Sequence, residues 1–181
     1  MPRAAFLAPL AAALYLALAA SPVRAAAEAP ALPVTNERAL INLLRSDAPP
    51  AEKALACKHL AIYGTKDCVS ALAPLLSDPH LASWARIPLE VIPGSAPNAA
   101  LRRAMGKLQG QLLIGVINSI GVRRDPKAVS GLVKKLKDTD PDVASAAAEA
   151  MGRIGGMKVA KALKQSLAAA PAPVRPAVAR G

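Results

Sequence analysis

The sequence predicts an all-α protein built from helix pairs stacked in a line, and three observations support this fold class. Of the 181 residues, 53% are hydrophobic and only 2% are aromatic. This composition favours helices that pack through small side chains, because alanine is the best helix former. Apolar residues recur at helical spacing between short turns. Turns and helix ends recur at a nearly constant interval along the chain, which indicates a solenoid.

Residues 1–27 are predicted to be a secretory signal peptide, and residues 28–35 a Pro/Ala linker. Arg3 gives a positive start, residues 4–20 are largely apolar, and Ala25-Ala26-Ala27 matches a small-residue cleavage site. Ala19–Ser21 is an alternative cleavage site, and an uncleaved membrane anchor is an alternative interpretation. The apolar run is short for a spanning helix. We therefore expect the mature chain to be periplasmic or extracellular, without a stable membrane span.

The first helix pair is expected over residues 37–63. Asn36 can cap a helix over Glu37–Ser46, because its side chain can accept a hydrogen bond from a free N–H group. A turn at Asp47 leads to a second helix over Ala51–Tyr63, which Gly64 ends. The apolar face of this second helix is predicted to include Cys57, Leu60 and Tyr63.

The second pair is predicted to be the most distorted of the array. Its helices are expected over Cys68–Ser77 and Leu81–Ile92, and each contains a proline, Pro74 and Pro88. A proline inside a helix removes a hydrogen bond and bends the axis. Residues 93–97 are expected to form the longest internal loop.

The remaining helices continue the pattern toward the end of the chain. In each, apolar residues mark a face at helical spacing, and Gly121 and Gly155 are predicted helix stops. Asp140 precedes Pro141 and is expected to cap an alanine-rich helix. The expected segments are Asn98–Leu108, Gln109–Ile120, Pro126–Lys137, the turn and helix of Asp138–Gly156, and Met157–Leu167.

The positions of the turns and stops support one repeat period throughout the array. The turn acids Asp47 and Asp78 are one period apart, and Asp138 follows two periods later. The stop glycines at 64, 94, 121 and 155 follow one another at intervals close to that period. A single pair cannot bury its apolar face alone, so stacking is what makes the core continuous.

The stretch A-V-S-G-L-V-K-K-L-K-D-T-D-P-D-V-A-S-A-A-A-E-A-M-G-R-I-G resembles a HEAT repeat, as does C-V-S-A-L-A-P-L-L-S-D-P. The period is similar to that of the short HEAT form of phycobilin-lyase-type proteins. The resemblance covers residues 36–170 and implies a right-handed α-α superhelix of four to five pairs. It also implies that second helices line a concave face and first helices an outer face. The arrangement resembles that of exported bacterial proteins in which HEAT arrays sit beside other domains. Residues 171–181 are expected to be a truncated next repeat or a disordered tail of a longer multidomain protein.

The two cysteines and two histidines do not predict a cofactor or metal site. Cys57 lies about 9 Å down its helix from the turn, too far for an easy bridge to Cys68. Two buried thiols are favoured over a disulfide. His59 and His80 lack further ligands at metal spacing. No nucleophile motif, phosphate loop or catalytic carboxylate pair is present in the sequence, so an enzyme is not predicted.

The net charge of +11 leaves polyanion binding as one alternative, with a solvated surface as the simpler interpretation. Nucleic acid is disfavoured by export and by the scarcity of aromatic residues. Most residues of the basic clusters are predicted to lie on first helices or in loops, hence on the outer face. The clusters are Arg102, Arg103 and Lys107; Arg123 and Arg124; Lys134, Lys135 and Lys137; and Lys158, Lys161 and Lys164.

The favoured function is a non-catalytic, exported scaffold that binds a protein partner or an adjacent domain. The polar positions expected to point into the concave face are Lys58, Arg86, Asn118 and Arg153. Trp84 is either an anchor for a partner or a core residue. The alternative function, by analogy with the phycobilin-lyase family, is an accessory lyase or chaperone for a bound chromophore.

Overall fold

The structure is a computed structural model that describes residues 36–167 and 175–180. Every regular element in those ranges is helical, which confirms the all-α prediction. The predicted signal peptide, the linker and the start of the tail lie outside the described residues. All described helices belong to one compact unit.

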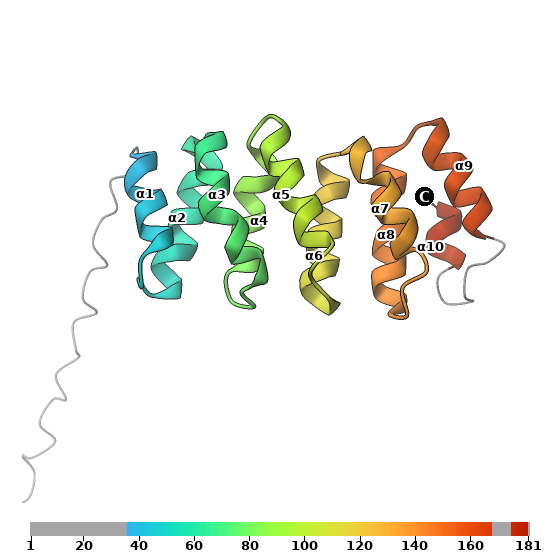
Figure 1. Cartoon of the computed structure of the whole chain (residues 1–181), viewed down its shortest axis with the longest axis horizontal. Coiled ribbons are helices and arrows are strands. Elements are labelled where there is room, and N and C mark those ends of the chain that lie inside the picture. The colour runs from blue at the N-terminus through green and yellow to red at the C-terminus, as the bar shows by residue number, and fades with distance from the viewer. Residues whose placement is uncertain (1–35, 168–174, 181) are drawn as a thin grey trace, which may run out of the picture. The chain divides into compact units, whose positions relative to one another are not determined.

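The helices alternate between two layers in chain order (Figure 1). The first-helix layer contains α1 (Glu37–Arg45), α3 (Val69–Leu72) between the 3-10 segments η1 (Lys66–Cys68) and η2 (Ala73–Ser77), α5 (Ser95–Met105), η3 (Pro126–Ala128) with α7 (Val129–Lys135), and α9 (Met157–Leu167). The second-helix layer contains α2 (Pro50–Tyr63), α4 (Ala82–Val91), α6 (Gly110–Val122), α8 (Pro141–Ile154) and α10 (Arg175–Arg180).

Contacts between successive second helices make this layer continuous. Helix α2 contacts α4, α4 contacts α6, α6 contacts α8, and α8 contacts α10. Within the first layer, α1 contacts α3, α3 contacts α5 and α7 contacts α9. The predicted stacking of helix pairs is therefore confirmed for the part of the chain that the structure describes.

The core repeats with the same period as the turns. Leu60, Leu89, Ile120 and Met151, one from each of α2, α4, α6 and α8, are all 0% exposed. They follow one another at nearly equal intervals along the chain. Burying a side chain of this size stabilises a fold by roughly 1.5–3 kcal/mol. Each pair thus adds equivalent apolar contacts to one shared core.

Side-chain caps form where the sequence predicts them. The Asn36 Oδ1 accepts a hydrogen bond from the backbone N–H of Ala39 at 3.2 Å. The Asp140 Oδ1 accepts one from the N–H of Asp142 at 2.9 Å, at the start of α8. These bonds satisfy N–H groups that have no partner within the helix.

Proline acts differently at its two positions in the second pair. After Leu72 the α-helix gives way to the 3-10 segment η2, which contains Pro74. In α4, by contrast, the helix continues through Pro88, which is buried. Burial of the ring among the neighbouring helices offsets the lost backbone hydrogen bond, since packing routinely overrides propensity.

Three sequence-based expectations are wrong in detail. The 93–97 loop is short, because α5 begins at Ser95 and includes Pro97; proline is tolerated in a first turn, where its missing N–H would have no helical partner. Tyr63 is 45% exposed rather than part of the core. Gly121 does not end α6, which continues to Val122.

Candidate functional site

Large apolar side chains are exposed along the second helices. Among the described residues, only one of the exposed large apolar side chains, Met157, lies outside α2, α4 and α6. We define the open face as six of these residues on second helices. They are Leu55 and Ile62 of α2, Trp84, Ile87 and Val91 of α4, and Val122 of α6, with exposed fractions between 37% and 73%.

Helical geometry places these residues on one side of each helix. Leu55 and Ile62 of α2 are seven residues apart, as are Trp84 and Val91 of α4, which is about two turns. The core residues of α4, such as Ala85 and Leu89, occupy the buried side. The same backbone repeat that forms the core therefore also aligns an exposed apolar stripe on neighbouring helices.

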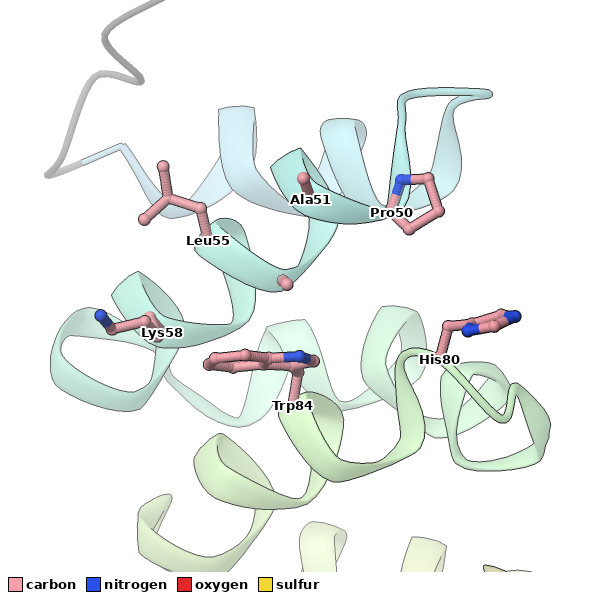
Figure 2. Close-up of a pocket in the computed structure, with 7 residues that line it drawn as sticks. Pro50, Ala51, Leu55, Lys58, His80 and Trp84 are labelled. Carbon is pink, nitrogen blue, oxygen red and sulfur yellow. The ribbon is translucent and has the colours of Figure 1, made fainter. Parts of the chain in front are cut away.

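Between α2 and α4 the open face is hollowed into a pocket (Figure 2). Its volume is about 390 Å³. The apolar part of its wall is formed by Pro50, Ala51, Ala54 and Leu55 of α2 and by Trp84 of α4. The two ionisable side chains that line it, Lys58 and His80, are both basic types. Leu55 and Trp84 thus meet solvent in a concave setting, which is where a partner's side chain can be enclosed.

The seam between α4 and α6 is held by polar contacts. The Arg86 Nη1 donates to the carbonyl oxygen of Gly115 at 3.0 Å, and the Ser119 hydroxyl donates to the Glu90 Oε1 at 2.6 Å. A Cβ at position 115 would lie 2.9 Å from the Arg86 Cζ, so a larger residue there would displace the guanidinium from this contact. Ser119 is fully buried, so its bond to Glu90 matters for the seam.

The structure separates the four predicted partner-binding residues into different settings. Lys58 is exposed and lines the pocket. Asn118 of α6 is half-buried, and Arg153 of α8 is exposed. Arg86 is half-buried and bonded across the seam, so part of its role is structural. All four lie on second helices, but Arg153 is not next to the pocket, since α6 separates α8 from α4.

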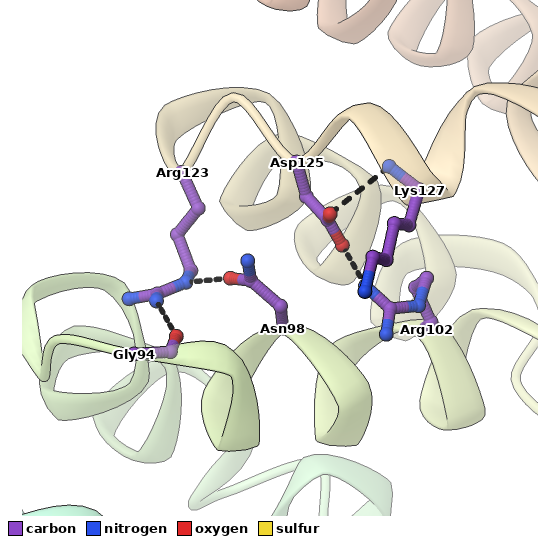
Figure 3. A network of polar contacts seen from close by, with 6 residues as sticks. All are labelled: Gly94, Asn98, Arg102, Arg123, Asp125 and Lys127. Carbon is purple, nitrogen blue, oxygen red and sulfur yellow. Dashed lines mark hydrogen bonds and ion pairs between the residues drawn. The ribbon is translucent and has the colours of Figure 1, made fainter.

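A guanidinium joins the end of α4 to the segment after α6 (Figure 3). The Arg123 Nη1 donates to the carbonyl oxygens of Leu89, Glu90 and Ile92 at 2.8, 2.9 and 2.8 Å, and its Nη2 donates to that of Gly94 at 2.9 Å. Its Nε donates to the side chain of Asn98. Burial lowers the pKa of Arg123, and the charges of Asp125 and Glu90 act in the opposite direction. The carbonyls at the end of a helix lack intrahelical partners, and a cation there is favourable.

A buried carboxylate stabilises the same corner. Asp125 is 2% exposed; it accepts a hydrogen bond from the N–H of Lys127 at 3.1 Å and forms an ion pair with Arg102 (Figure 3). Arg102 and Arg123 were predicted to be outer-face basic residues, but both are tied to neighbouring repeats. The surface charge that remains for binding is therefore smaller than the sequence indicates.

The seam between α6 and α8 is closely packed. A Cβ at Gly121 would lie 2.9 Å from the Cα of Ala150, a backbone atom that cannot move aside easily. Five alanines of α8 are buried, namely Ala144, Ala146, Ala147, Ala148 and Ala150. The glycine that resembles a helix stop in the sequence is thus a point of close approach between two helices.

The two cysteines are buried free thiols, in agreement with the favoured interpretation. Burial raises the pKa of Cys57 to about 12. Burial, followed by the charge of Glu37, raises the pKa of Cys68 to about 12. A thiol nucleophile must be ionised to react, so neither side chain is suited to catalysis near neutral pH.

Neither a metal cluster nor a spanning helix is found within residues 36–167 and 175–180. In these ranges no group of three or more His, Cys, Asp or Glu side chains is placed to hold a metal ion. None of the helices described there is both long and apolar enough to cross a membrane.

The open face was largely missed by sequence reasoning, which singled out polar residues on the second helices. Only Trp84 was considered as an anchor. A usable signal existed, because Ile62, Val91 and Val122 follow one another at the repeat period, outside the positions that form the core. Apolar residues that recur with the repeat period but off the core side are candidates for a binding surface.

Part of the chain matches a known family. A family model described as HEAT repeats matches residues 97–181. The crystal structure of an engineered protein, solved as a Northeast Structural Genomics Consortium target, is similar at 19% sequence identity and a TM-score of 0.48, covering 80% of this chain and 76% of that one. No curated protein matches the chain.

Proposed function

We propose that the HEAT repeats of this chain form a non-catalytic scaffold that binds a protein partner, and that the open face is its binding surface. The observation that carries the proposal is the alignment of six exposed apolar side chains on three successive second helices. Exposed apolar side chains gathered on neighbouring helices are typical of interaction sites. HEAT repeats generally serve protein interaction, which agrees with this proposal.

The polar residues beside the open face would then form its rim. Lys58 and Asn118 flank the apolar positions of α2 and α6. Arg153 takes the position that Ile62, Val91 and Val122 occupy in earlier helices, at the same repeat spacing, and would mark the charged end of the face. An apolar centre with a polar rim is the usual plan of a protein interface.

Export is part of the same proposal. The positive start, apolar run and small-residue site of residues 1–27 support it. Amino-terminal sequencing of the mature protein from the source organism tests it. A new terminus at or near Glu28 is the expected result, whereas retention of Met1 in the cytoplasmic fraction would contradict it.

Affinity purification with matched variants tests the binding surface. Tagged full-length protein, the double variant Ile62→Asp/Val91→Asp, and the control Lys161→Asp on α9 are incubated with extract of the source organism. We expect a protein that is retained by the wild type and the control and lost from the double variant. Both replaced side chains are more than half exposed, so the melting temperature should change by only a few degrees. Equal retention by all three proteins would overturn the proposal.

A further inference from the structure

We infer that the pocket between α2 and α4 binds an extended acidic peptide segment of the partner, with an apolar side chain seated against Trp84. The inference rests on the proposed function and names the chemistry of what the open face recognises. In this pocket a concave wall, an exposed aromatic ring and two side chains of basic type, Lys58 and His80, lie together.

The wall of the pocket is suited to one apolar side chain. Pro50, Ala54 and Leu55 line it from α2, and Trp84 lines it from α4; Figure 2 shows the Trp84 ring between the two helices. Leu55 is 38% exposed and Trp84 is 37% exposed, so both lose contact with water when a ligand covers them. A rigid aromatic ring at the edge of a cavity is a common anchor at interfaces.

The two basic side chains lie at opposite ends of the pocket (Figure 2). Lys58 is eight residues along α2 from Pro50, which is roughly 12 Å along a helix axis. His80 lies at the other end, in the turn that precedes α4. An extended chain covers about 12–14 Å in four residues. A five-residue segment with an acidic residue at each end and an apolar residue in the middle therefore matches the length of the α2 wall from Pro50 to Lys58.

Charge favours an acidic rather than a basic segment. Both ionisable residues that line the pocket are basic types, and the chain carries a net charge of +11. Asp78, in the turn before α4, accepts hydrogen bonds from the backbone N–H groups of His80 and Leu81 at 2.8 and 3.3 Å, and neither it nor Glu52 of α2 lines the pocket. Complementary charge across an interface steers the partner and excludes wrong ones.

The chain has a single tryptophan, so tryptophan fluorescence reports directly on this pocket. Full-length protein is titrated with acetyl-Glu-Ser-Leu-Ser-Glu-amide, and two control peptides replace either both acids with lysine or the leucine with serine. We expect a saturable blue shift for the first peptide, with a Kd on the order of 1 mM because so short a ligand makes few contacts. Each control peptide should bind at least about tenfold more weakly, a difference of about 1.4 kcal/mol.

Variants locate the interaction. Lys58→Ala should weaken binding about fivefold and Leu55→Ser about tenfold, while Lys107→Ala, in the segment between α5 and α6, should leave it unchanged. Lys58 is exposed, so its variant should fold, and an unchanged melting temperature checks this. No saturable shift up to about ten times the expected Kd, or equal binding of the lysine peptide, would overturn the inference.

One other occupant is tested in the same titration. A synthetic copy of residues 28–35 contains Glu28 and Leu32; if it bound more tightly than the acidic peptide, the pocket would belong to the chain's own segment and the assignment to a partner would fail. The inference also fails separately from the proposed function. If the acidic peptide does not bind but Ile62→Asp/Val91→Asp loses its protein partner, the proposed scaffold function is supported and the assignment of an acidic peptide to the pocket is wrong.

Discussion

The seam between α2 and α4 and the seam between α6 and α8 follow the same backbone plan but differ in their side chains. The first leaves a pocket of about 390 Å³ beside Trp84. The second brings Gly121 so close to Ala150 that even a methyl group would be tight. At corresponding repeat positions, Ile87 of α4 gives way to Glu149 of α8, and Val91 gives way to Arg153.

Under the proposed function, this difference means that one repeat unit serves two purposes in the same array. The α6–α8 seam is closed by small residues and contributes mainly to stability. The α2–α4 seam is closed in its core, at Leu60 and Leu89, but is open and apolar at its surface. Substitutions in the α6–α8 seam should therefore lower stability more than binding, and substitutions at the surface of the α2–α4 seam should weaken binding more than they lower stability.

The largest effect on stability is expected for Arg123, which joins the end of α4 to the segment after α6. Arg123→Ala would leave the carbonyls of Leu89, Glu90 and Ile92 without their charged donor. Hydrogen bonds to charged groups contribute about 1.5–3 kcal/mol, so we expect a loss of about 3 kcal/mol in chemical denaturation. Arg123→Lys should recover only part of it, since an ammonium lacks the planar fork of donors. Exposed Arg103→Ala is the control; a loss as large as that of Arg123→Ala would contradict the assigned role.

Gly121→Ala is the next largest expected effect and tests the closed seam. The added methyl would meet the Cα of Ala150 at 2.9 Å, and overpacking of this kind costs about 1–3 kcal/mol. The same change at Gly106, where the nearest atom is 3.6 Å away, should not destabilise the fold. Thermal unfolding followed by circular dichroism measures both. If Gly121→Ala were as stable as the wild type, α6 and α8 could not pack as closely at this position as the structure shows.

The reactivity of the two thiols tests whether the core beneath the α2–α4 pocket excludes solvent. Cys57 and Cys68 are 0% exposed, and burial raises the pKa of each to about 12. Neither should react with a thiol reagent at pH 8 until the protein unfolds. Fast labelling of the native protein would show that the helices around these cysteines separate without global unfolding.

The raised thiol pKa values also set a direction for stability with pH. Below pH 9 both thiols are protonated in the folded and in the unfolded protein, so burying them as neutral groups contributes fully to stability. Above pH 9 the thiols ionise first in the unfolded protein, so the free energy of unfolding falls as pH rises toward about 12. Denaturation of the double variant Cys57→Ala/Cys68→Ala over the same range provides the comparison. Its stability should depend less steeply on pH, and an equal slope would exclude the thiols as the cause.

The smallest expected effect lies in the turn before α8. The hydrogen bond from the Lys135 Nζ, at 2.9 Å, is the main cause that lowers the pKa of Asp138, with the backbone N–H of Asp140 assisting. Both side chains are half-buried at the surface, where solvent still screens the charges, so Asp138→Asn should cost about 0.5 kcal/mol or less near neutral pH. Because the folded pKa is lowered, the contribution is present above about pH 4 and is lost as pH falls below it. A loss that persists unchanged at pH 2 would point to another cause.

The fold could be predicted from the sequence because helix caps, prolines and core residues act locally and repeat. Asn36, Asp140 and the series from Leu60 to Met151 lie where periodicity puts them. The errors concern residues whose role depends on a neighbouring repeat. In the sequence Gly121 resembles a helix stop, but in the structure it lies against Ala150 of α8. Arg123 resembles an exposed surface charge, but it donates to the carbonyls at the end of α4.

The candidate surface was predicted only in part for the same reason. Sequence reasoning placed partner contacts on the second helices, and Lys58 does line the pocket. It favoured polar residues, however, since exposed and buried apolar residues on one helix look alike in a sequence. Only the packing of α2 against α4 shows that Leu55 and Trp84 remain open to solvent.

Photo-crosslinking at corresponding positions of α4 and α8 tests the central comparison most directly. A benzophenone amino acid is placed at position 87 or at position 149 of the full-length protein, in cells of the source organism, and adducts are identified by mass spectrometry. We predict that position 87 captures one protein partner and that position 149, with Glu149 replaced, captures it at least about tenfold less, the ratio expected for a difference of about 1.4 kcal/mol. Equal capture at the two positions, or capture at 149 alone, would contradict the division of the array into an open binding seam and a closed structural one.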